Sequence, residues 1–467
     1  MKEKRNNISF FFNPKAIAII GASPTPGKLS SVILESLNRI GFSGSIYPVN
    51  PKYTSINDLK CYGSIHEIKN DIDIAVIALP SQSVLETLKD MAKTTPYPPF
   101  LRGNKVKGAI IVSAGFKETG ENGRKLEGEI KGIVEKFGIR VMGPNCMGIY
   151  DTISKVDTFF VPKDRVGRPV RGGISIVSQS GSFAATIMDE LALEGIGVSR
   201  VISYGNGADV DESDCLEFLK DDEATNAIAL YIESVNDGRR FVEAAFRCTR
   251  KKPVVAVKVG RRDAGVNAAR SHTGAMTGRY EIYRAAFKKA GVTEIDGYEG
   301  LKDACRIFNV YGLIKGKKVL IITDGGGIGV RIADACENSG LEVAGITEAA
   351  RNRLTSRLPS FCAVGNPIDL TGSVTDEDYL TALEEGLKDG FDIAIMTVLW
   401  GPPQLTEGLV EKLKKTMKRY NTPIIVCSPG GEFTKMMGRI FGEKGIPVFS
   451  SPESAVRAAA ILTGKRI

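Results

Sequence analysis

The chain has 467 residues, enough for about three domains at about 150 residues each. Hydrophobic residues make up 43% and charged residues 25%, with 51 glycines, which is typical of a soluble, glycine-rich α/β protein. The formal net charge is +8, but the basic residues are spread along the chain with few aromatic residues between them, which favours a small anionic ligand over nucleic acid.

No apolar run approaches the length of about 18 residues that a membrane span needs, and the sequence shows no secretory signal. We therefore expect a cytoplasmic protein that does not bind a membrane. The eight cysteines lack the spacing of metal ligands, and several lie in apolar patterns typical of reduced, buried thiols. With only two histidines, no metal site is expected.

The first motif is a strand, a turn and a helix. An apolar run at residues 16–20 ends in the small-residue turn 21–28, and a helical pattern follows at 29–40. Such a turn places backbone N–H groups at a helix N-terminus, where they bind phosphate. Further strands are expected at 45–49, 72–79, 108–113 and 140–142, with helical stretches between them, which predicts a doubly wound parallel sheet.

The turn departs from the dinucleotide fingerprint because the middle glycine is missing. The second strand is followed by Asn50 and Lys52, without the carboxylate that would bind the ribose of NAD. We expect a nucleotide-like ligand with an extra phosphate, such as coenzyme A; the alternative is a Rossmann-like domain without a ligand. The predicted binding residues lie in loops that follow strands: Gly21, Ala22, Ser23, Gly27, Lys28, Asn50, Lys52, Leu79, Pro80, Ser113, Ala114, Gly115 and Asn145.

A second α/β unit follows a predicted loop at residues 156–171. A strand at 174–177 leads into Ser178, Ser180, Gly181 and Ser182, and a helix is expected at 183–193. Hydroxyl groups and free N–H groups at a helix start can bind phosphate. The alternative is ordinary N-capping, which needs only one of these serines.

Later strands are expected at 198–204, 227–232 and 253–259. Glu233 follows the second of these, and His272 lies in a small-residue loop after the third. In a parallel sheet both residues belong to one edge, where a carboxylate can orient an imidazole that acts as a nucleophile. The alternative is a structural loop histidine and a solvated glutamate. His66 lies in a helix-like stretch and is expected at the surface.

The last third of the chain repeats the α/β pattern after a linker at residues 314–318. Strands are expected at 319–323, 343–346, 393–400 and 423–427, with a helix at 453–462. Three glycines at 325–327 either bind phosphate or allow close packing and subunit contact, and we favour the second interpretation. The sequence contains no P-loop motif.

Six motifs of the chain resemble those of the α subunit of the ADP-forming acetyl-CoA synthetases, in the succinyl-CoA synthetase superfamily. They lie at residues 21–28, 49–52, 142–148, 178–182, 203–206 and 271–274, in the order expected for that family. The resemblance implies three domains. Residues 1–147 would form a Rossmann-like coenzyme A-binding domain, 148–312 a flavodoxin-like domain that carries a phosphohistidine, and 313–467 a second flavodoxin-like domain for subunit contact.

The same resemblance implies the reaction acyl-CoA + ADP + phosphate ⇌ acid + ATP + CoA, by way of an acyl phosphate. His272 would be phosphorylated and Glu233 would steady it, while Ser178, Ser180, Gly181, Ser182 and Gly274 would bind the phosphoryl group. ATP or ADP and Mg²⁺ would bind to a separate ATP-grasp β subunit, in a heterotetramer of two α and two β subunits. Two alternatives remain: a non-catalytic CoA- or nucleotide-binding regulator of the same fold, and an NAD(P)-dependent oxidoreductase, which the glycine spacing disfavours.

Overall fold

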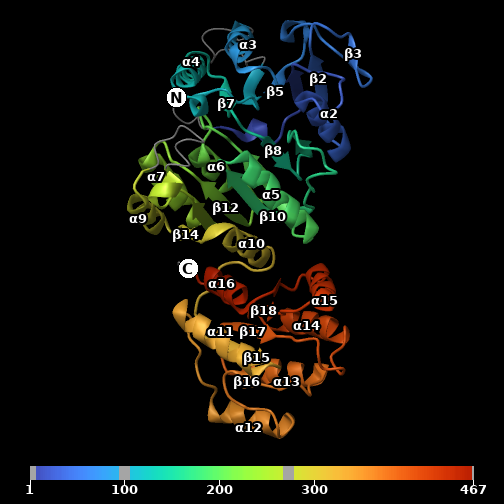
Figure 1. Ribbon diagram of the computed structural model, residues 1–467, viewed down its shortest axis with the longest axis vertical. Coiled ribbons are helices and arrows are strands. Elements are labelled where there is room, and N and C mark those ends of the chain that lie inside the picture. The colour runs from blue at the N-terminus through green and yellow to red at the C-terminus, as the bar shows by residue number, and fades with distance from the viewer. Residues whose placement is uncertain (1–6, 94–105, 267–277, 465–467) are drawn as a thin grey trace. The chain divides into compact units, whose positions relative to one another are not determined.

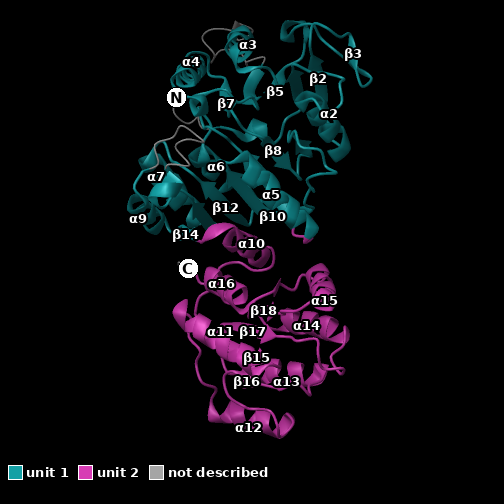
Figure 2. Ribbon diagram, in the orientation of Figure 1, with its two compact units in different colours: residues 1–193, 197–294 teal, residues 194–196, 295–467 magenta. Residues whose placement is uncertain are grey.

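The computed structural model describes residues 7–93, 106–266 and 278–464. Helices and strands alternate through these residues (Figure 1). The chain forms two compact units (Figure 2): unit 1 comprises residues 1–193 and 197–294, and unit 2 comprises 194–196 and 295–467.

The first sheet of unit 1 has five parallel strands in the order β2-β1-β5-β6-β7. The strands are β1 (Ala16–Ile20), β2 (Ser45–Val49), β5 (Ile72–Ile77), β6 (Val106–Ile111) and β7 (Arg140–Met142). The helices that follow β1, β5 and β6 are α2 (Leu29–Ile40), α3 (Ser81–Lys93) and α4 (Glu121–Phe137). The winding direction reverses between β1 and β5, and open α/β sheets bind ligands at the carboxyl ends of the strands on either side of such a point.

Both faces of this sheet are buried, which explains why its strands read as continuous apolar runs. Ile17 and Ile19 of β1 belong to a core cluster that includes the apolar residues of α2. Ala18 and Ile20, on the opposite face, pack with residues of α3 and α4. Alternate residues of one strand therefore serve two cores.

The second sheet of unit 1 has seven strands in the order β14-β13-β12-β10-β11-β8-β9. Its parallel strands are β10 (Arg171–Ser178), β11 (Val198–Ser203), β12 (Ala227–Ile232), β13 (Val254–Lys258) and β14 (Thr293–Glu294). The antiparallel strands β8 (Gly148–Asp151) and β9 (Val156–Asp157) extend one edge. The associated helices are α5 (Gly181–Leu193), α6 (Glu212–Leu219), α7 (Gly238–Thr249) and α9 (Tyr280–Ala290).

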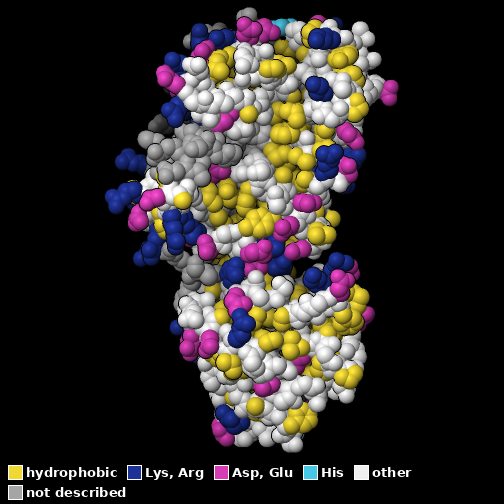
Figure 3. All heavy atoms as spheres, in the orientation of Figure 1, with side chains coloured by type: hydrophobic (Ala, Val, Ile, Leu, Met, Phe, Trp, Pro, Cys, Tyr) yellow, Lys and Arg dark blue, Asp and Glu magenta, His cyan; other side chains and the backbone are white. Residues whose placement is uncertain are grey.

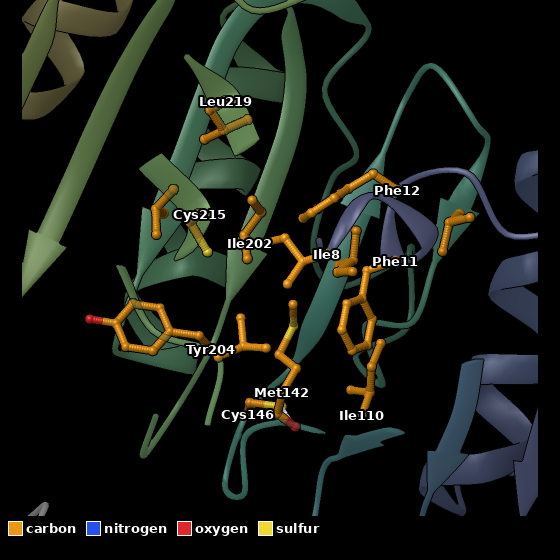
Figure 4. Close-up of a cluster of buried hydrophobic side chains, with 14 of the residues drawn as sticks. Ile8, Phe11, Phe12, Ile110, Met142, Cys146, Ile202, Tyr204, Cys215 and Leu219 are labelled. Atoms are coloured by element: carbon orange, nitrogen blue, oxygen red, sulfur yellow. Dashed lines mark hydrogen bonds between the residues drawn. The ribbon is translucent and has the colours of Figure 1, made fainter. Parts of the chain in front are cut away.

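One buried cluster joins the two sheets of unit 1 (Figure 4). It contains Ile110 and Met142 from the first sheet and Ile202 from the second. Phe12, near the N-terminus, stacks on Phe218 of α6 with ring centroids 4.2 Å apart. The two sheets therefore share a core, and the loops at their edges are held relative to one another.

Unit 2 contains a parallel sheet of five strands in the order β16-β15-β17-β18-β19. The strands are β15 (Val319–Thr323), β16 (Ile368–Asp369), β17 (Ile393–Thr397), β18 (Ile424–Cys427) and β19 (Val448–Phe449). The helices are α10 (Gly297–Phe308), α11 (Gly326–Asn338), α12 (Glu348–Arg357), α13 (Asp376–Leu387), α14 (Gly408–Arg419), α15 (Glu432–Glu443) and α16 (Pro452–Leu462).

The predicted α/β fold with parallel sheets is confirmed, while two local predictions are wrong. Residues 343–346 form no strand, and the edge position beside β15 is taken by β16 instead. The loop expected at 156–171 begins with β9 and ends at the first residue of β10, because Val156 is buried and the Val156–Asp157 backbone pairs with β8. The boundaries of the three domains stay a prediction, since the division into compact units runs near residue 294.

Candidate active site

The turn after β1 is held closely against its neighbours. Gly21 has a φ of 83°, and a Cβ at this position would lie 2.7 Å from Leu79 Cδ2, so both the conformation and the space require glycine. The backbone N–H groups of Gly21 and Ala22 donate to Val49 O, at 3.0 and 3.2 Å. The turn is therefore fixed at its start, whereas Ser23 is half-buried and Gly27 and Lys28 are exposed.

Asn50 connects this turn to the end of β2. Its Nδ2 donates to Ala22 O at 2.7 Å, and its Oδ1 accepts from Lys52 N at 3.0 Å. The Lys52 side chain is exposed beside the turn. The helix α2 begins at Leu29 without a side-chain cap. Ser31 N already donates to Lys28 O at 3.0 Å, so only the N–H groups of Leu29 and Ser30 are offered to an anion here.

The loops after β5, β6 and β7 are also joined. Ser113 Oγ donates to Leu79 O, and Asn145 N donates to Ser113 O at 2.9 Å. Gly115 has a φ of 107°, and a Cβ there would lie 2.6 Å from Ser81 Oγ. Pro80 and Ala114, the other predicted coenzyme-binding residues of these loops, are exposed. The structure thus brings the predicted loops together at the carboxyl edge of the first sheet.

This edge meets the edge of the second sheet within unit 1. Pro144 O accepts from Asn206 N at 2.9 Å, and Gly143 O accepts from Ala208 N at 3.0 Å. Gly205 has a φ of 60°, and a Cβ there would collide with Asn145 O. The close approach of the two backbones explains why a glycine occupies position 205.

A buried polar network that the sequence analysis did not predict crosses the same junction. Lys117 Nζ donates to Asn206 O, and Asn206 Nδ2 donates to Glu118 at 2.7 Å and to Glu127 at 2.9 Å. Burial lowers the pKa of Lys117. Burial alone would raise the pKa of Glu118, but hydrogen bonds from Asn206 and from the N–H groups of Phe116 and Gly115 bring it below its usual value.

A second charged cluster is formed by residues that are close in sequence to those of the junction. Arg140 Nε lies 2.8 Å from Asp209 Oδ2, and Arg140 Nη2 lies 3.2 Å from Asp214 Oδ1. Arg240 pairs with Asp214 and with Asp211, the latter at 2.9 Å. These ion pairs connect β7 of the first sheet with α6 and α7 beside the second.

The serine loop after β10 contains several internal hydrogen bonds. The buried Ser178 Oγ donates to Ser180 O at 2.7 Å. Ser180 Oγ accepts from Phe183 N at 3.3 Å and lies 3.1 Å from Ser182 Oγ. Ser180 and Gly181 are half-buried and Ser182 is exposed. Ser178 therefore shapes the loop, while Ser180 and Ser182 present hydroxyl groups at the N-terminus of α5.

Glu233 lies one strand away from this loop and is 5% exposed. Its backbone N–H donates to Gln179 Oε1 at 2.9 Å, and its carbonyl oxygen accepts from Lys258 Nζ at 2.8 Å. Burial raises the pKa of the neighbouring Tyr231 to about 12, and the Glu233 charge acts in the same direction. Glu233 and the serine loop thus lie together, as the sequence predicted for one sheet edge.

Gln179 and Lys258 also belong to this edge, and neither was predicted from the sequence. In the sequence, Gln179 stands out only as a member of the serine motif. Lys258 stands out only as a polar residue near the end of an apolar strand. A lysine in the last position of an apolar run is a usable signal, because such a residue points either to solvent or into the site at the strand end.

His272 and Gly274 lie outside the described residues, so their predicted roles stay predictions. The described part of this segment continues from β13 to residue 266.

The remaining sequence predictions concern histidine, cysteine and metal. His66 is half exposed and its Nε2 lies 2.8 Å from Asp90 Oδ2. All eight cysteines are free thiols, and seven of them are buried. Among the residues that the structure describes, no group of His, Cys, Asp and Glu has the arrangement of a metal site. Within the same residues, no helix is long and apolar enough to span a bilayer.

Basic and acidic side chains are interspersed on the face drawn in Figure 3.

In unit 2, the glycine-rich turn after β15 is closely packed. A Cβ at Gly325 would lie 2.8 Å from Leu399 Cδ1, and one at Gly326 would lie 2.5 Å from Asp369 Oδ2. These distances agree with close packing at Gly325 and Gly326, whereas a Cβ at Gly327 would meet nothing within 4 Å.

Three family profiles match successive parts of the chain. A CoA binding domain matches residues 15–152, a succinyl-CoA ligase-like flavodoxin domain matches 171–308, and a ligase-CoA domain matches 319–463.

Relatives of known name match nearly the whole chain. The acetate–CoA ligase (ADP-forming) II subunit alpha of Pyrococcus furiosus is 36% identical over 462 residues, 97% of each chain. An acetate–CoA ligase (ADP-forming) of Methanocaldococcus jannaschii is 37% identical over 97% of this chain, which spans 63% of that longer relative. A 4-hydroxybutyrate–CoA ligase (ADP-forming) of Nitrosopumilus maritimus is 31% identical over 96% of this chain and 63% of its own length.

A solved structure also matches. The dinucleotide-forming acetyl-coenzyme A synthetase 1 of Candidatus Korarchaeum cryptofilum, in complex with phosphate and ADP, superposes with a TM-score of 0.90. The sequence identity is 31%, over 98% of this chain and 97% of that chain.

Proposed function

This chain belongs to the α-subunit-type family of ADP-forming acetyl-CoA synthetases, in the succinyl-CoA ligase superfamily. We propose that it binds acyl-CoA and phosphate as one subunit of an acid–CoA ligase. One observation carries the proposal. Gln179 connects the serine loop at the start of α5 to the buried Glu233, so the proposed phosphate-binding loop and the proposed carboxylate share one sheet edge. Members of this family are ADP-forming acid–CoA ligases.

The proposed reaction has three transfers. A phosphate oxygen attacks the thioester carbonyl carbon, the C–S bond breaks, and coenzyme A leaves as the thiolate, which gives an acyl phosphate. An imidazole nitrogen of His272 attacks the phosphorus, the P–O bond to the acyl group breaks, and the acid leaves as a carboxylate. The terminal phosphate oxygen of ADP then attacks the phosphohistidine, which gives ATP and restores His272.

The described residues support the phosphoryl steps. The N-terminus of α5 offers backbone N–H groups and a positive dipole end, to which Ser180, Gly181 and Ser182 belong. Glu233 would accept a hydrogen bond from one imidazole nitrogen, so that the other nitrogen carries the electron pair that attacks phosphorus.

The loops of the first sheet would hold coenzyme A. The N–H groups of Leu29 and Ser30 at the start of α2 and the ammonium groups of Lys28 and Lys52 suit its phosphates. The loops that contain Leu79, Ser113 and Asn145 lie at the same edge and would carry the thiol end toward the second sheet.

We propose that a separate ATP-grasp β subunit binds ADP and Mg²⁺, in a heterotetramer of two α and two β subunits. The names of the relatives that are called subunit alpha support a partner subunit. Acetate is the proposed acid because acetate–CoA ligases predominate among the full-length relatives, whereas one relative is named for 4-hydroxybutyrate and another for trans-feruloyl-CoA.

ATP formation tests this function. The chain is mixed with a purified ATP-grasp subunit, ADP, Mg²⁺ and phosphate, and ATP is measured with acetyl-CoA, 4-hydroxybutyryl-CoA or feruloyl-CoA as the acyl donor. We expect ATP formation that requires both subunits and is fastest with acetyl-CoA. Coenzyme A binding without ATP formation, with a partner that is active alongside another α subunit, would instead indicate a regulatory protein.

A further inference from the structure

Lys258 is a buried cation at the carboxyl end of β13. Lys258 is only 1% exposed, although lysine is among the residues that proteins bury least often. Its Nζ donates to Glu233 O at 2.8 Å and to Val259 O, and it lies 4.5 Å from the centroid of the Tyr283 ring. Two carbonyl groups and one aromatic face therefore surround the ammonium group.

Glu233 is held from both sides. Strand β12 lies between β10 and β13, and Glu233 follows it directly. Gln179, after β10, accepts from the Glu233 N–H at 2.9 Å, while Lys258, at the end of β13, donates to the Glu233 carbonyl group at 2.8 Å. Both backbone polar groups of Glu233 are thus bound by side chains from the ends of the flanking strands, which restricts the direction of the Glu233 carboxylate.

The charge of Lys258 also suits this position. Burial lowers its pKa to about 8, the Glu233 carboxylate acts in the opposite direction, and Arg261 lowers it further. Lys258 is therefore mostly protonated near neutral pH. The Glu233 carboxylate belongs to a residue that is only 5% exposed, and at such a poorly solvated site a fixed cation has a large effect on its charge.

We propose that Lys258 is a positioning residue for phosphoryl transfer: it holds the Glu233 backbone, and its charge offsets that of the Glu233 carboxylate. This inference rests on the proposed function, because it requires a phosphoryl group to reach Glu233. Lys258 acts through Glu233 and is not assigned a contact with the substrate.

The test compares Lys258→Met with the matched control Lys252→Met. Lys252 precedes β13 at its opposite end, and its Nζ donates to two carbonyl groups, Leu219 O at 2.7 Å and Asp222 O. Each variant loses one lysine with two backbone hydrogen bonds, but only Lys258 lies at the candidate site. Circular dichroism and coenzyme A binding check that each variant is folded.

The readout is the initial rate at which acid-labile phosphate appears on the chain, with acetyl-CoA, labelled phosphate and the partner subunit. We expect Lys258→Met to lower this rate at least tenfold and Lys252→Met to change it less than twofold. Equal rates for wild type and Lys258→Met would overturn the role of Lys258 alone. No label on the wild-type chain, with an active partner, would overturn the proposed function.

Two further measurements separate positioning from general damage. If Lys258 acts through Glu233, the labelling rate of the double variant Lys258→Met/Glu233→Gln should be no more than twofold lower than that of Glu233→Gln. If the fold-losses of the two single variants instead multiply in the double variant, the proposal is contradicted. The labelling rate of the wild type should also fall above about pH 8, as Lys258 loses its proton. The charged and titratable groups near Lys258 are Glu233, Arg261 and Tyr283. This second measurement needs no variant, and a rate that stays constant to pH 9.5 would overturn the inference.

Discussion

The side-chain oxygen of Gln179 lies 2.9 Å from the backbone nitrogen of Glu233. The same oxygen accepts a second hydrogen bond, from Ser234 N at 2.9 Å, and Gln179 Nε2 donates to Ser234 Oγ at 3.1 Å. Because Gln179 stands between Ser178 and Ser180, one residue sets the distance between the serine loop and Glu233. The two halves of the candidate phosphoryl site are therefore joined directly.

We expect Gln179→Ala to lower the free energy of unfolding of unit 1 by about 2 kcal/mol, because two buried N–H groups lose their acceptor. The labelling rate should fall as well. Urea unfolding followed by circular dichroism measures the first effect. The fluorescence of Trp400, the single tryptophan and a residue of unit 2, serves as an internal reference that should not shift.

A matched control is Gln82→Ala, at an exposed position in α3, which should change the free energy of unfolding by less than about 0.5 kcal/mol. If Gln179→Ala changed the free energy of unfolding as little as this control, the hydrogen bonds of Gln179 would not hold the edge together.

Arg140 is predicted to be a major contributor to the stability of unit 1. Its guanidinium group pairs with Asp209 and Asp214 while nearly buried, so Arg140→Met leaves two carboxylates without this partner. The expected loss is about 3–5 kcal/mol in the free energy of unfolding. The exposed pair of Arg39 with Glu35 offers the control, since Arg39→Met should cost about 0–1 kcal/mol. Similar urea midpoints for the two variants would contradict the prediction.

Glu212 should make the stability of unit 1 depend on pH. It is 2% exposed, and burial, aided by the charge of Asp211, raises its pKa to about 8. Between about pH 4.5 and pH 8 the folded state then holds a proton that the unfolded state has released, so the free energy of unfolding falls as the pH rises through this range.

The variant Glu212→Gln keeps the neutral form at every pH. At pH 8 we expect it to be more stable than the wild type by at least about 1.4 kcal/mol, the equivalent of one pKa unit, with a smaller difference at pH 5. Urea unfolding at pH 5, 6.5 and 8 measures both curves. Parallel curves for variant and wild type would show that Glu212 is not the group responsible.

Lys52 is expected to contribute to coenzyme A binding through its charge. Because it is exposed, Lys52→Ala should weaken binding by no more than about 1 kcal/mol, a rise in Kd of about fivefold. The difference should shrink as the salt concentration rises. Calorimetric titration measures the Kd, and Lys125→Ala, at an exposed position in α4, is the control. An unchanged Kd for Lys52→Ala would remove this residue from the site.

Continuous apolar runs made most of the fold predictable. The strands at 16–20, 227–232 and 319–323 have the predicted bounds, because both faces of the sheets are buried there and each strand ends where turn residues begin. The error at 343–346 has a physical cause: these residues are half-buried or exposed at an edge, where an apolar pattern does not distinguish a strand from an extended loop.

The candidate site was predictable only in part. Strand-end loops and the position of Glu233 followed from the parallel topology, which collects the carboxyl ends of strands at one edge. The roles of Gln179 and Lys258 did not follow, because they depend on which backbone groups their side chains reach. The same holds for Lys117 and Asn206, whose network joins two loops that lie 89 positions apart in the sequence.

We propose that this chain carries the phosphoryl group on His272 between acyl phosphate and ADP. The direct measurement incubates wild type and His272→Asn with acetyl-CoA, labelled phosphate and the ATP-grasp subunit, maps the labelled peptide, and then adds ADP. We expect acid-labile label on the wild-type peptide that contains His272, its transfer to ATP when ADP is added, and no label on His272→Asn. Label on the His272→Asn chain, or ATP formed at the wild-type rate by that variant, would contradict the account.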